Sequence, residues 1–385
     1  MSLRLRGYSY SDYQKIVYNP KITIMKKFKS LVLTVIGLLC SLSASAEDFV
    51  VDGFFFDITS QAKFTVEISH IAKQGEITIP SKVTYFGKEY SVISIGSQAC
   101  LNNNKITSIT IPDGITNIGD RAFSQCSQLT SIHIGKDVKN IGLGAFQFCK
   151  ELKNIVIPKG VTSIGLVAFS GCDKLETIIV DKDNTIYDSR ENCNAIIETS
   201  TNIMVVGCKN SSFPHSVTHI GNYAFAHNTS IKSLTIPDNI IGIGEHSFAY
   251  CEALETISIG NNVTEIEKWG FYGCYKLTKL ISYAEVPPTC GTMAFEGIDK
   301  ETCVLQVPES SLAAYQQADH WKEFFFIEDV LTAIGGVTVD GAVSATVDVY
   351  STNGMLIKRN AELKNLKHEL PAGIYIIGGK KVLVK

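Results

Sequence analysis

The sequence predicts an α/β repeat protein, a solenoid whose coils each use 23 residues and stack on one another. The first observation is a nine-residue stretch, ITNIGDRAF (115–123), which returns with small changes as VKNIGLGAF, VTSIGLVAF, VTHIGNYAF, IIGIGEHSF and VTEIEKWGF. The second is its interval, because the closing phenylalanines are 23 residues apart within two series: Phe123, Phe146 and Phe169, then Phe225, Phe248 and Phe271. A period in the twenties is typical of a leucine-rich-repeat solenoid, in which no unit buries its apolar face alone.

The start of the chain has the composition of an export signal. Residues 25–29 are basic, residues 31–42 are apolar, and Ala44-Ser45-Ala46 has the small-x-small form of a signal-peptidase site. We therefore expect residues 25–46 to be a secretory signal peptide. We expect residues 1–24 to be upstream sequence outside the native start.

The same N-terminal segment also determines what we expect of transmembrane helices and of the net charge. The apolar run is shorter than the roughly 20 residues of a membrane span, so we expect no transmembrane helix in the mature chain. A lipoprotein anchor on Cys40 is the alternative, which the bulky Leu39 before it disfavours. Residues 1–46 carry seven Lys/Arg and one Asp, so their removal lowers the formal net charge from −3 to −9. Phosphate recognition needs clustered Lys and Arg, which excludes nucleic acid as an expected partner.

Residues 47–94 and 330–385 differ from the repeat and flank it. Short runs of alternating apolar and polar residues, such as KFTVEISHI, predict an N-terminal β cap over residues 47–94. Residues 95–327 hold the leucine-rich repeats and end in SLAAYQQADHWKEF, which predicts a capping helix. Residues 330–385 contain two predicted hairpins, on Asn353-Gly354 and Gly378-Gly379, so we expect a small β-sandwich-like C-terminal domain.

Each coil is expected to contain a strand and a helical turn. Ile155-x-Ile157 followed by Pro158 predicts a strand with alternate side chains pointing inward. Residues 167–169 are expected to form a helical turn that buries Phe169. The interval breaks once, between Phe169 and Phe225, which are 56 residues apart. We interpret residues 181–213 as a β-hairpin insertion on one edge of the solenoid, and insertions in repeat arrays often carry the distinctive surface.

Cysteines recur three residues after the repeated phenylalanines. The members of this ladder are Cys126, Cys149, Cys172, Cys251 and Cys274. A small polar side chain at this position of a solenoid faces inward and satisfies backbone groups. Their parallel Cβ vectors suit a disulfide poorly, so we expect buried free thiols. Cys193 with Cys208, and Cys290 with Cys303, are better disulfide candidates in an oxidising compartment.

No arrangement typical of catalysis is found in the sequence. It lacks a nucleophile elbow, a phosphate-cradling glycine loop and a carboxylate pair in a defined cleft. His215 and His219 have the spacing of a helical metal pair, but they flank a strand-like segment and no third ligand is spaced to join them. We therefore expect no enzyme, no cofactor and no metal site.

Two surfaces are candidates for ligand binding. The outward positions of the predicted sheet carry small hydroxyl side chains interrupted by His133, Val156 and Ile179, which suits either an extended partner or a neutral face. The second surface is an aromatic group near the C-terminal end of the repeats. Tyr250, Tyr272 and Tyr275 are its main members, and they suit a protein or a sugar.

Three segments resemble the BspA-like leucine-rich repeat proteins over residues 47–327: ITNIGDRAFSQCSQLTSIHI, the lead-in GEITIPSKVTYFGKEYSVISIG and the closing VPESSLAAYQQADHWKEF. The inserted YDSRENCNAIIET is similar to a segment met in that family. The final TVDVYSTNGMLIKR and LPAGIYIIGGKKVLVK resemble the C-terminal sorting or anchoring domains of bacterial cell-surface proteins.

The resemblance implies a bacterial protein that is secreted or attached to the cell surface, in association with the outer membrane. It also implies an interaction role, because some members are adhesins for extracellular-matrix proteins, and it supplies no catalytic residues. Our leading hypothesis is an adhesin-like protein that binds a host or extracellular macromolecule through the solenoid surface. The alternative is a carbohydrate-binding module that uses the tyrosine group.

Overall fold

The structure is a computed structural model that describes residues 49–330, 346–351, 355–362, 369–371, 373–377 and 380–384. The expected signal peptide (25–46), the upstream sequence (1–24) and the turns on Asn353-Gly354 and Gly378-Gly379 lie outside these residues. The domain boundaries expected from the sequence remain predictions.

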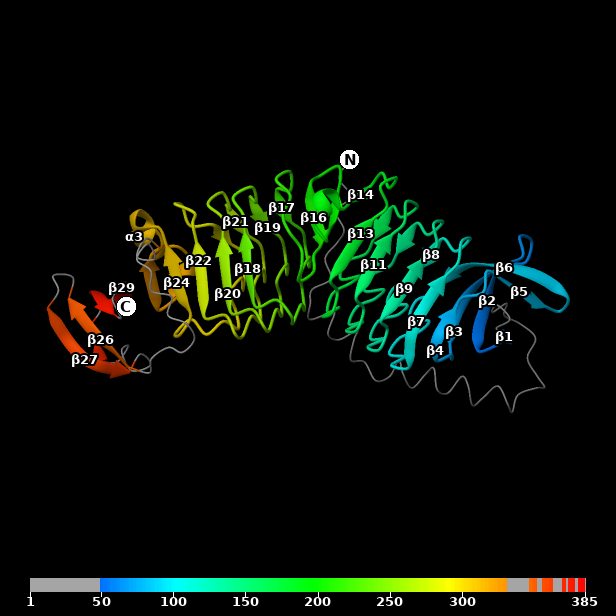
Figure 1. Ribbon diagram of the computed structural model, residues 1–385, viewed down its shortest axis with the longest axis horizontal. Helices are drawn as coiled ribbons and strands as arrows, with labels where there is room; N and C mark the ends of the chain where they lie inside the picture. Colours follow the sequence, from blue (N-terminus) through cyan, green and yellow to red (C-terminus); the bar gives the residue numbers. More distant parts are fainter. Residues whose placement is uncertain are drawn as a thin grey trace. The chain divides into compact units, whose positions relative to one another are not determined.

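Successive coils stack through parallel pairing of equivalent strands, a longer and a shorter one in each coil (Figure 1). Ile155 of β11, for example, lies opposite Ile178 of β13, one coil later. The first block of coils (residues 95–180) contains β7 (Ile106–Ile111), β8 (Asn117–Ile118), β9 (Ser131–Ile134), β10 (Asn140–Ile141), β11 (Asn154–Ile157), β12 (Ser163–Ile164) and β13 (Thr177–Val180). The second block (residues 217–307) contains β17 (His219–Ile220), β18 (Ser233–Ile236), β19 (Gly242–Ile243), β20 (Thr256–Ile259), β21 (Glu265–Ile266), β22 (Lys279–Ser282), β23 (Thr289–Cys290) and β24 (Val304–Val307). The solenoid predicted from the 23-residue period is confirmed.

The phenylalanine of each repeat lies in the core, stacked on its equivalents in the neighbouring coils. Ring centroids are 5.4 Å apart from Phe123 to Phe146 and 5.5 Å from Phe146 to Phe169. In the second block they are 5.1 Å apart from Phe225 to Phe248 and again from Phe248 to Phe271. The rings of each pair are nearly parallel. Two inner columns of aromatic rings result, one in each block.

The segment around each phenylalanine forms turns instead of the expected helical turn. Residues two before and two after the phenylalanine have positive φ, as in Val167 (54°) and Phe148 (59°), which interrupts a helix. Alternate N–H groups then point at the next coil, so that Phe146 N donates to Ala168 O at 2.8 Å. We call this series of bonds the turn ladder. The α-helical part of the α/β class is correspondingly small: within the described residues, the α-helix is α3 (Leu312–Tyr315).

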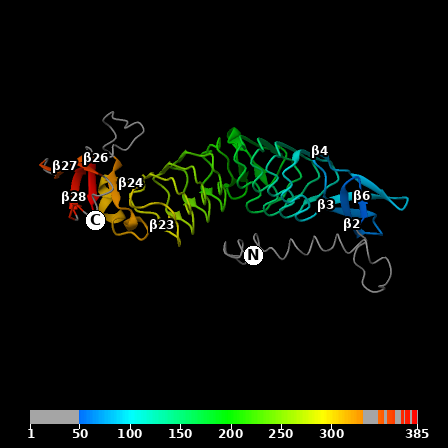
Figure 2. The ribbon, with the colours of Figure 1, turned by 90° about the horizontal axis from the view of Figure 1, so that it is seen from below.

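The N-terminal strands extend the strand ladders of the first block. The strands are β1 (Phe49–Val51), β2 (Phe54–Ser60), β3 (Thr65–Ile71), β4 (Gly75–Thr78), β5 (Lys82–Tyr85) and β6 (Lys88–Ile95). β1, β2 and β3 are antiparallel, and β3 runs parallel to β6, which pairs with β8. β4 pairs with β7. The series of paired longer strands and the series of paired shorter strands therefore both begin on strands of the cap (Figure 2, blue to cyan).

The residues inserted between the blocks form β14 (Tyr187–Asp188), the 3-10 helix η1 (Arg190–Asn192), β15 (Ile196–Glu198) and β16 (Ile203–Val206). β15 and β16 form an antiparallel hairpin, and β16 pairs in parallel with β17. Ile196 packs into the core of the first block, whereas Ile197 and Met204 pack into the core of the second. The expectation that the hairpin lies on an edge is therefore wrong, because both of its faces are apolar and it lies within the stack.

The C-terminal coil is covered by aromatic residues and then by a further sheet. After β24 come η2 (Glu309–Ser311), α3, η3 (Trp321–Glu323) and β25 (Phe326–Asp329). Trp321 is buried 4.8 Å from Phe295, and its Nε1 donates to Pro288 O at 2.7 Å. β25 is followed in the sheet by β29 (Lys380–Val384), β28 (Gly373–Ile377), β26 (Thr346–Ser351) and β27 (Leu356–Glu362). These described C-terminal strands form one sheet, continuous with the longer strands, without the second layer of a sandwich.

The phenylalanine column predicts a strong dependence of stability on a single ring. Phe146→Ala removes a ring stacked on both sides, and we expect it to lower the free energy of unfolding by about 3–5 kcal/mol. Lys136→Ala, which breaks only an exposed ion pair with Asp113, should leave that free energy nearly unchanged. Urea unfolding monitored by circular dichroism compares the two. Equal losses would contradict the register of the coils.

Candidate functional site

The first predicted surface is a column on the outer face of the longer strands. His133, Val156 and Ile179 occupy the same position in β9, β11 and β13, and Val156 lies directly opposite Ile179. Their side chains are exposed, Val156 by 52% and Ile179 by 48%. The structure therefore brings these three residues together as an outward-facing column. Among the described strands, β13 pairs only with β11, so the column ends at Ile179.

The tyrosine group does not form one flat surface. The ring of Tyr250 stacks on His227 at 4.8 Å and meets Tyr272 edge to face at 5.3 Å and 78°. Both tyrosines are half-buried, whereas Tyr275 is 57% exposed. Tyr250 and Tyr272 thus lie together as packing partners, and they are less exposed than Tyr275.

The repeated cysteines form a ladder of buried thiols, and each thiol donates a hydrogen bond to a carbonyl of the preceding coil. Cys149 Sγ lies 3.3 Å from Phe123 O, and Cys274 Sγ lies 3.3 Å from Phe248 O. Cys126, Cys172 and Cys251 make the equivalent bonds. Burial raises the pKa of Cys172 and of Cys251 to about 12. Cys172 and Cys251 are therefore protonated at neutral pH and are unsuited to nucleophilic chemistry.

The four cysteines suggested for disulfides are also free thiols in the structure. Cys193 lies in the core of the second block and Cys208 in that of the first, so the two thiols are on different faces of the inserted hairpin. Burial raises the pKa of Cys290 and Cys303 to about 12. Both pairings remain predictions.

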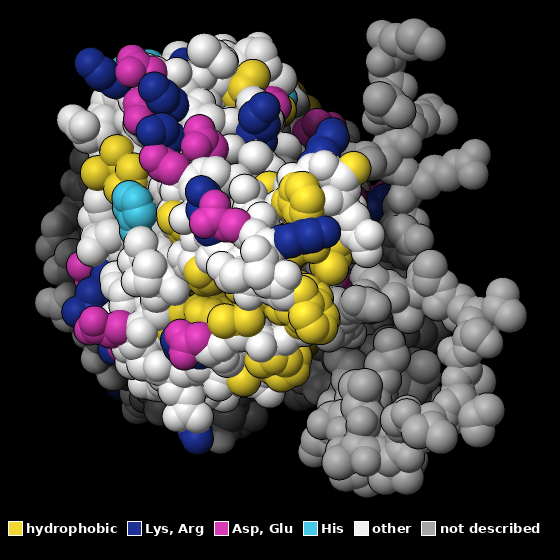
Figure 3. All heavy atoms as spheres, turned by 90° about the vertical axis from the view of Figure 1, so that its right-hand side faces the viewer, with side chains coloured by type: hydrophobic (Ala, Val, Ile, Leu, Met, Phe, Trp, Pro, Cys, Tyr) yellow, Lys and Arg dark blue, Asp and Glu magenta, His cyan; other side chains and the backbone are white. Residues whose placement is uncertain are grey.

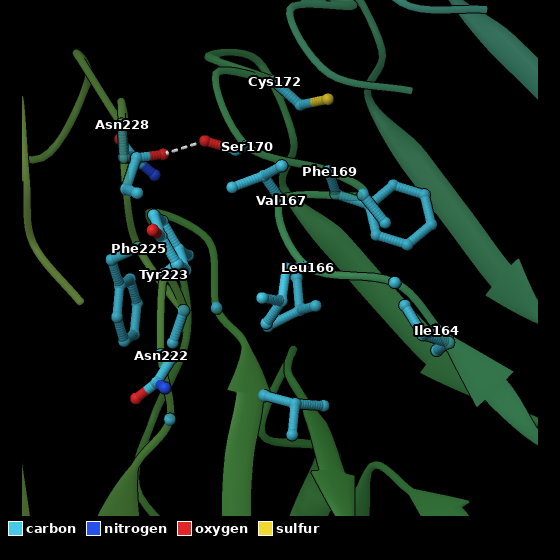
Figure 4. A pocket seen from close by; sticks show the side chains of 18 of the residues that line it. Ile164, Leu166, Val167, Phe169, Ser170, Cys172, Asn222, Tyr223, Phe225 and Asn228 are labelled. Carbon is cyan, nitrogen blue, oxygen red and sulfur yellow. Dashed lines mark hydrogen bonds between the residues drawn. The ribbon is translucent and has the colours of Figure 1, made fainter. Parts of the chain in front are cut away.

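A groove that the sequence did not reveal lies where the two blocks meet. Its volume is about 300 Å³. One wall is the turn segment of the last coil of the first block, with Leu166 and Val167, and the facing wall carries Asn222 and Tyr223 (Figure 4). The hairpin strand β16 also lines the groove, through Ile203 and Val205. Leu166 is 50% exposed, so the groove has an accessible apolar side chain.

The groove interrupts the turn ladder. In the preceding coil, Gly144, Phe146 and Phe148 donate their N–H groups to the next coil at 3.0, 2.8 and 2.8 Å. The equivalent donors at the groove are the N–H groups of Val167, Phe169 and Gly171, and none of them has an acceptor among the described residues. Three backbone donors of the groove wall are therefore without an acceptor in the part of the chain that the structure describes.

The opposite wall has lost its acceptors to other donors. Ala224 O accepts from Gly207 N of the insertion at 2.8 Å. Ala226 O accepts from the hydroxyl of Ser170 at 2.6 Å, the bond drawn in Figure 4. By analogy with the other coils, these carbonyls would have received the N–H groups of Phe169 and Gly171. The inserted hairpin thus prevents the two walls from closing.

The charge of the groove is low and slightly negative. No Lys, Arg or His lines it among the described residues, and its one carboxylate is Glu198. That carboxylate accepts a hydrogen bond from Thr201 Oγ1 at 2.6 Å. In the sequence, the 56-residue interval between Phe169 and Phe225 marks the position of the groove, but it does not predict the shape of the groove.

An aromatic stack continues from the groove along the second block. Tyr223, His246 and Trp269 stack with centroids 4.6 and 4.7 Å apart. Burial, reinforced by the nearby His227, lowers the pKa of His246 to about 4. Burial likewise lowers the pKa of His227 to about 4. Both imidazoles are therefore neutral in the fold at physiological pH.

The cap presents a further apolar surface that the sequence reasoning missed. Phe86 is 83% exposed at the turn between β5 and β6, and Val50, Val51 and Phe64 are also exposed. Figure 3 shows apolar side chains gathered on the face of the molecule at this end. Lys88 Nζ lies 5.5 Å from the centre of the Phe64 ring.

Within the described residues, no cluster of three or more His, Cys, Asp or Glu is arranged to hold a metal ion. None of the helices there has the length and apolar character that crossing a membrane requires.

The buried histidines predict a loss of stability in acid. Above pH 6.5 both are neutral in the folded and unfolded chains; as the pH falls toward 4, the unfolded chain takes up protons first, and the free energy of unfolding decreases. For His246 this amounts to about 3 kcal/mol. His246→Phe keeps the stack and removes the proton site, so its melting temperature should fall less between pH 7 and pH 4.5 than that of the wild type. His215→Phe, at an exposed site, is the control. An unchanged pH dependence in His246→Phe would refute the assignment.

Comparisons with solved structures give bacterial leucine-rich repeat proteins. A protein from Bacteroides ovatus is 27% identical, covering 69% of this chain and 80% of that one, with a TM-score of 0.38. A leucine-rich cell surface protein from Faecalibacterium prausnitzii is 21% identical, covering 71% and 98%, with a TM-score of 0.33. The pneumococcal vaccine antigen PcpA is 18% identical, covering 70% and 96%, with a TM-score of 0.42.

Curated proteins gave no match. Residues 73–198 and 204–314 match the BspA type leucine rich repeat region, in six copies. Because this match covers more than half of the sequence, the chain belongs to the family of proteins with BspA type leucine-rich repeats.

Proposed function

We propose that this chain is a secreted or cell-surface bacterial protein that binds other proteins through the outer face of the longer strands of its first block. The family match supports an interaction role, and the basic, apolar and small-x-small segments of residues 25–46 support export. Association with the outer membrane and binding of extracellular-matrix proteins are the finer parts of this proposal.

The observation that carries the proposal is the exposed column on the sheet. Val156 and Ile179 are β-branched, half-exposed and directly opposite each other on paired strands. Ser and Thr side chains surround them at the neighbouring outward positions, including Thr177 and Ser131. A rigid apolar centre with a polar surround is the usual anatomy of a protein interface.

The test is a binding assay on immobilised extracellular-matrix proteins with the chain from Glu47 onward. The double variant Val156→Asp/Ile179→Asp places two charges at the centre of the column, and we expect it to weaken binding at least tenfold. Thr235→Asp occupies the corresponding position of β18 in the second block and is the matched control, with less than a twofold effect. Equal binding by the wild type and the double variant would exclude this face.

A carbohydrate ligand would give a different pattern. The alternative predicts that a glycan array is bound by the wild type and that Tyr272→Ala abolishes the signal. Binding to glycans in the absence of any bound protein would replace the proposal with this alternative.

A further inference from the structure

We infer that the groove between the blocks is a second binding site, and that its ligand is a short extended segment of a partner protein, held by its backbone carbonyl groups. This inference rests on the proposed protein-binding function and gives it a specific chemistry. It uses a surface distinct from the column of His133, Val156 and Ile179.

The first step is the hydrogen-bonding capacity of the wall. Val167, Phe169 and Gly171 are alternate residues, and their N–H groups are the only members of the turn ladder in the first block that lack a protein acceptor within the described residues. A backbone donor without a partner must be hydrated or bound by a ligand, since leaving it dry costs about as much as a lost hydrogen bond. In the preceding coils of the first block the acceptors are carbonyl oxygens of alternate residues, for example those of Ala145 and Gln147. A chain segment that presents alternate carbonyls along one side therefore matches this wall.

The second step is charge. Anions are the other common ligands of convergent N–H groups, and they are normally accompanied by Lys or Arg. The described groove has none, and Glu198 would repel an anion. A neutral acceptor is favoured, and the peptide carbonyl is the neutral acceptor that a protein supplies in a regular series.

The third step is the apolar part of the groove. Leu166 is exposed on the donor wall, and Val205 and Val206 are half-buried on the hairpin. A volume of about 300 Å³ is at the lower end of the range for ligand pockets and holds only a short stretch of chain. The ligand is therefore a short extended segment with a small apolar side chain, bound in the manner of an added strand, with backbone bonds for affinity and a side-chain pocket for selectivity.

The premise can be measured in the purified protein without any ligand. Hydrogen exchange resolved to single amides should show the N–H groups of Val167, Phe169 and Gly171 exchanging at least tenfold faster than those of Gly144, Phe146 and Phe148, their bonded equivalents. Equal protection of the two sets would show that the groove is closed, and the inference would fail.

The ligand class is tested with a phage-displayed library of random 12-residue peptides selected on the wild-type protein. We expect selected peptides to lose at least tenfold in affinity for Leu166→Asp and less than twofold for Ile241→Asp, an exposed apolar residue outside the groove. Replacing individual peptide amides by esters weakens the carbonyl acceptors and should reduce affinity several-fold, and the bound peptide should slow exchange at the three amides. Peptides that bind both variants equally, or a library that yields no binder, would overturn the inference.

The outcomes separate this inference from the proposed function. If matrix proteins bind to the wild type and to Leu166→Asp alike, and no groove-dependent peptide is found, the groove has no such role and the column remains the interface. If no protein and no peptide binds, both proposals fail.

Discussion

The backbone hydrogen bonds between coils are the constraint on which the rest of this structure depends. Each coil is too thin to bury its own apolar residues, so it is stable only when the next coil satisfies its backbone and covers its phenylalanine. The bonds have a fixed direction in the turn ladder, where Phe123 N donates to Ala145 O and Phe146 N donates to Ala168 O. A chain built in this way always has an unsatisfied last coil, and the molecule must cover it.

The protein meets this requirement differently at each place where the repeat stops. At the N-terminal side, strands of the cap enter both ladders directly, through β6 with β8 and β4 with β7. At the C-terminal side, Trp321 packs on Phe295. β25 pairs with β29 and so extends the sheet of longer strands. Between the blocks, β16 supplies a partner for β17 but none for the donors of Val167, Phe169 and Gly171. The turn ladder is therefore open here. It is also open in the last coil of the second block, where the N–H groups of Met293, Phe295 and Gly297 have no acceptor among the described residues, but between the blocks the open ladder lines a groove.

The sequence predicted the parts of this fold that depend on repetition. The spacing of Phe123, Phe146 and Phe169 implies one position per coil, and identical positions in a stack must form a column. The tyrosines show where such reasoning ends: Tyr250 follows Phe248 by two residues, whereas Tyr272 follows Phe271 by one, so they are not equivalent and meet edge to face. The insertion has no repeat to compare with. That Ile196 and Ile197 would face two different cores depends on where the hairpin lies, which its own sequence does not specify.

The interrupted ladder also explains why a binding site can exist in so regular a molecule. A complete solenoid satisfies every backbone group within itself and offers a partner only side chains. Where the ladder is open, the donors are held by rigid coils, with Phe169 stacked on Phe146 behind them and Ser170 bonded across the gap to Ala226. Little conformational entropy remains to be lost there on binding, which favours recognition of even a short segment. An insertion that breaks the repeat can thus convert the bonds that build the fold into bonds available to a partner.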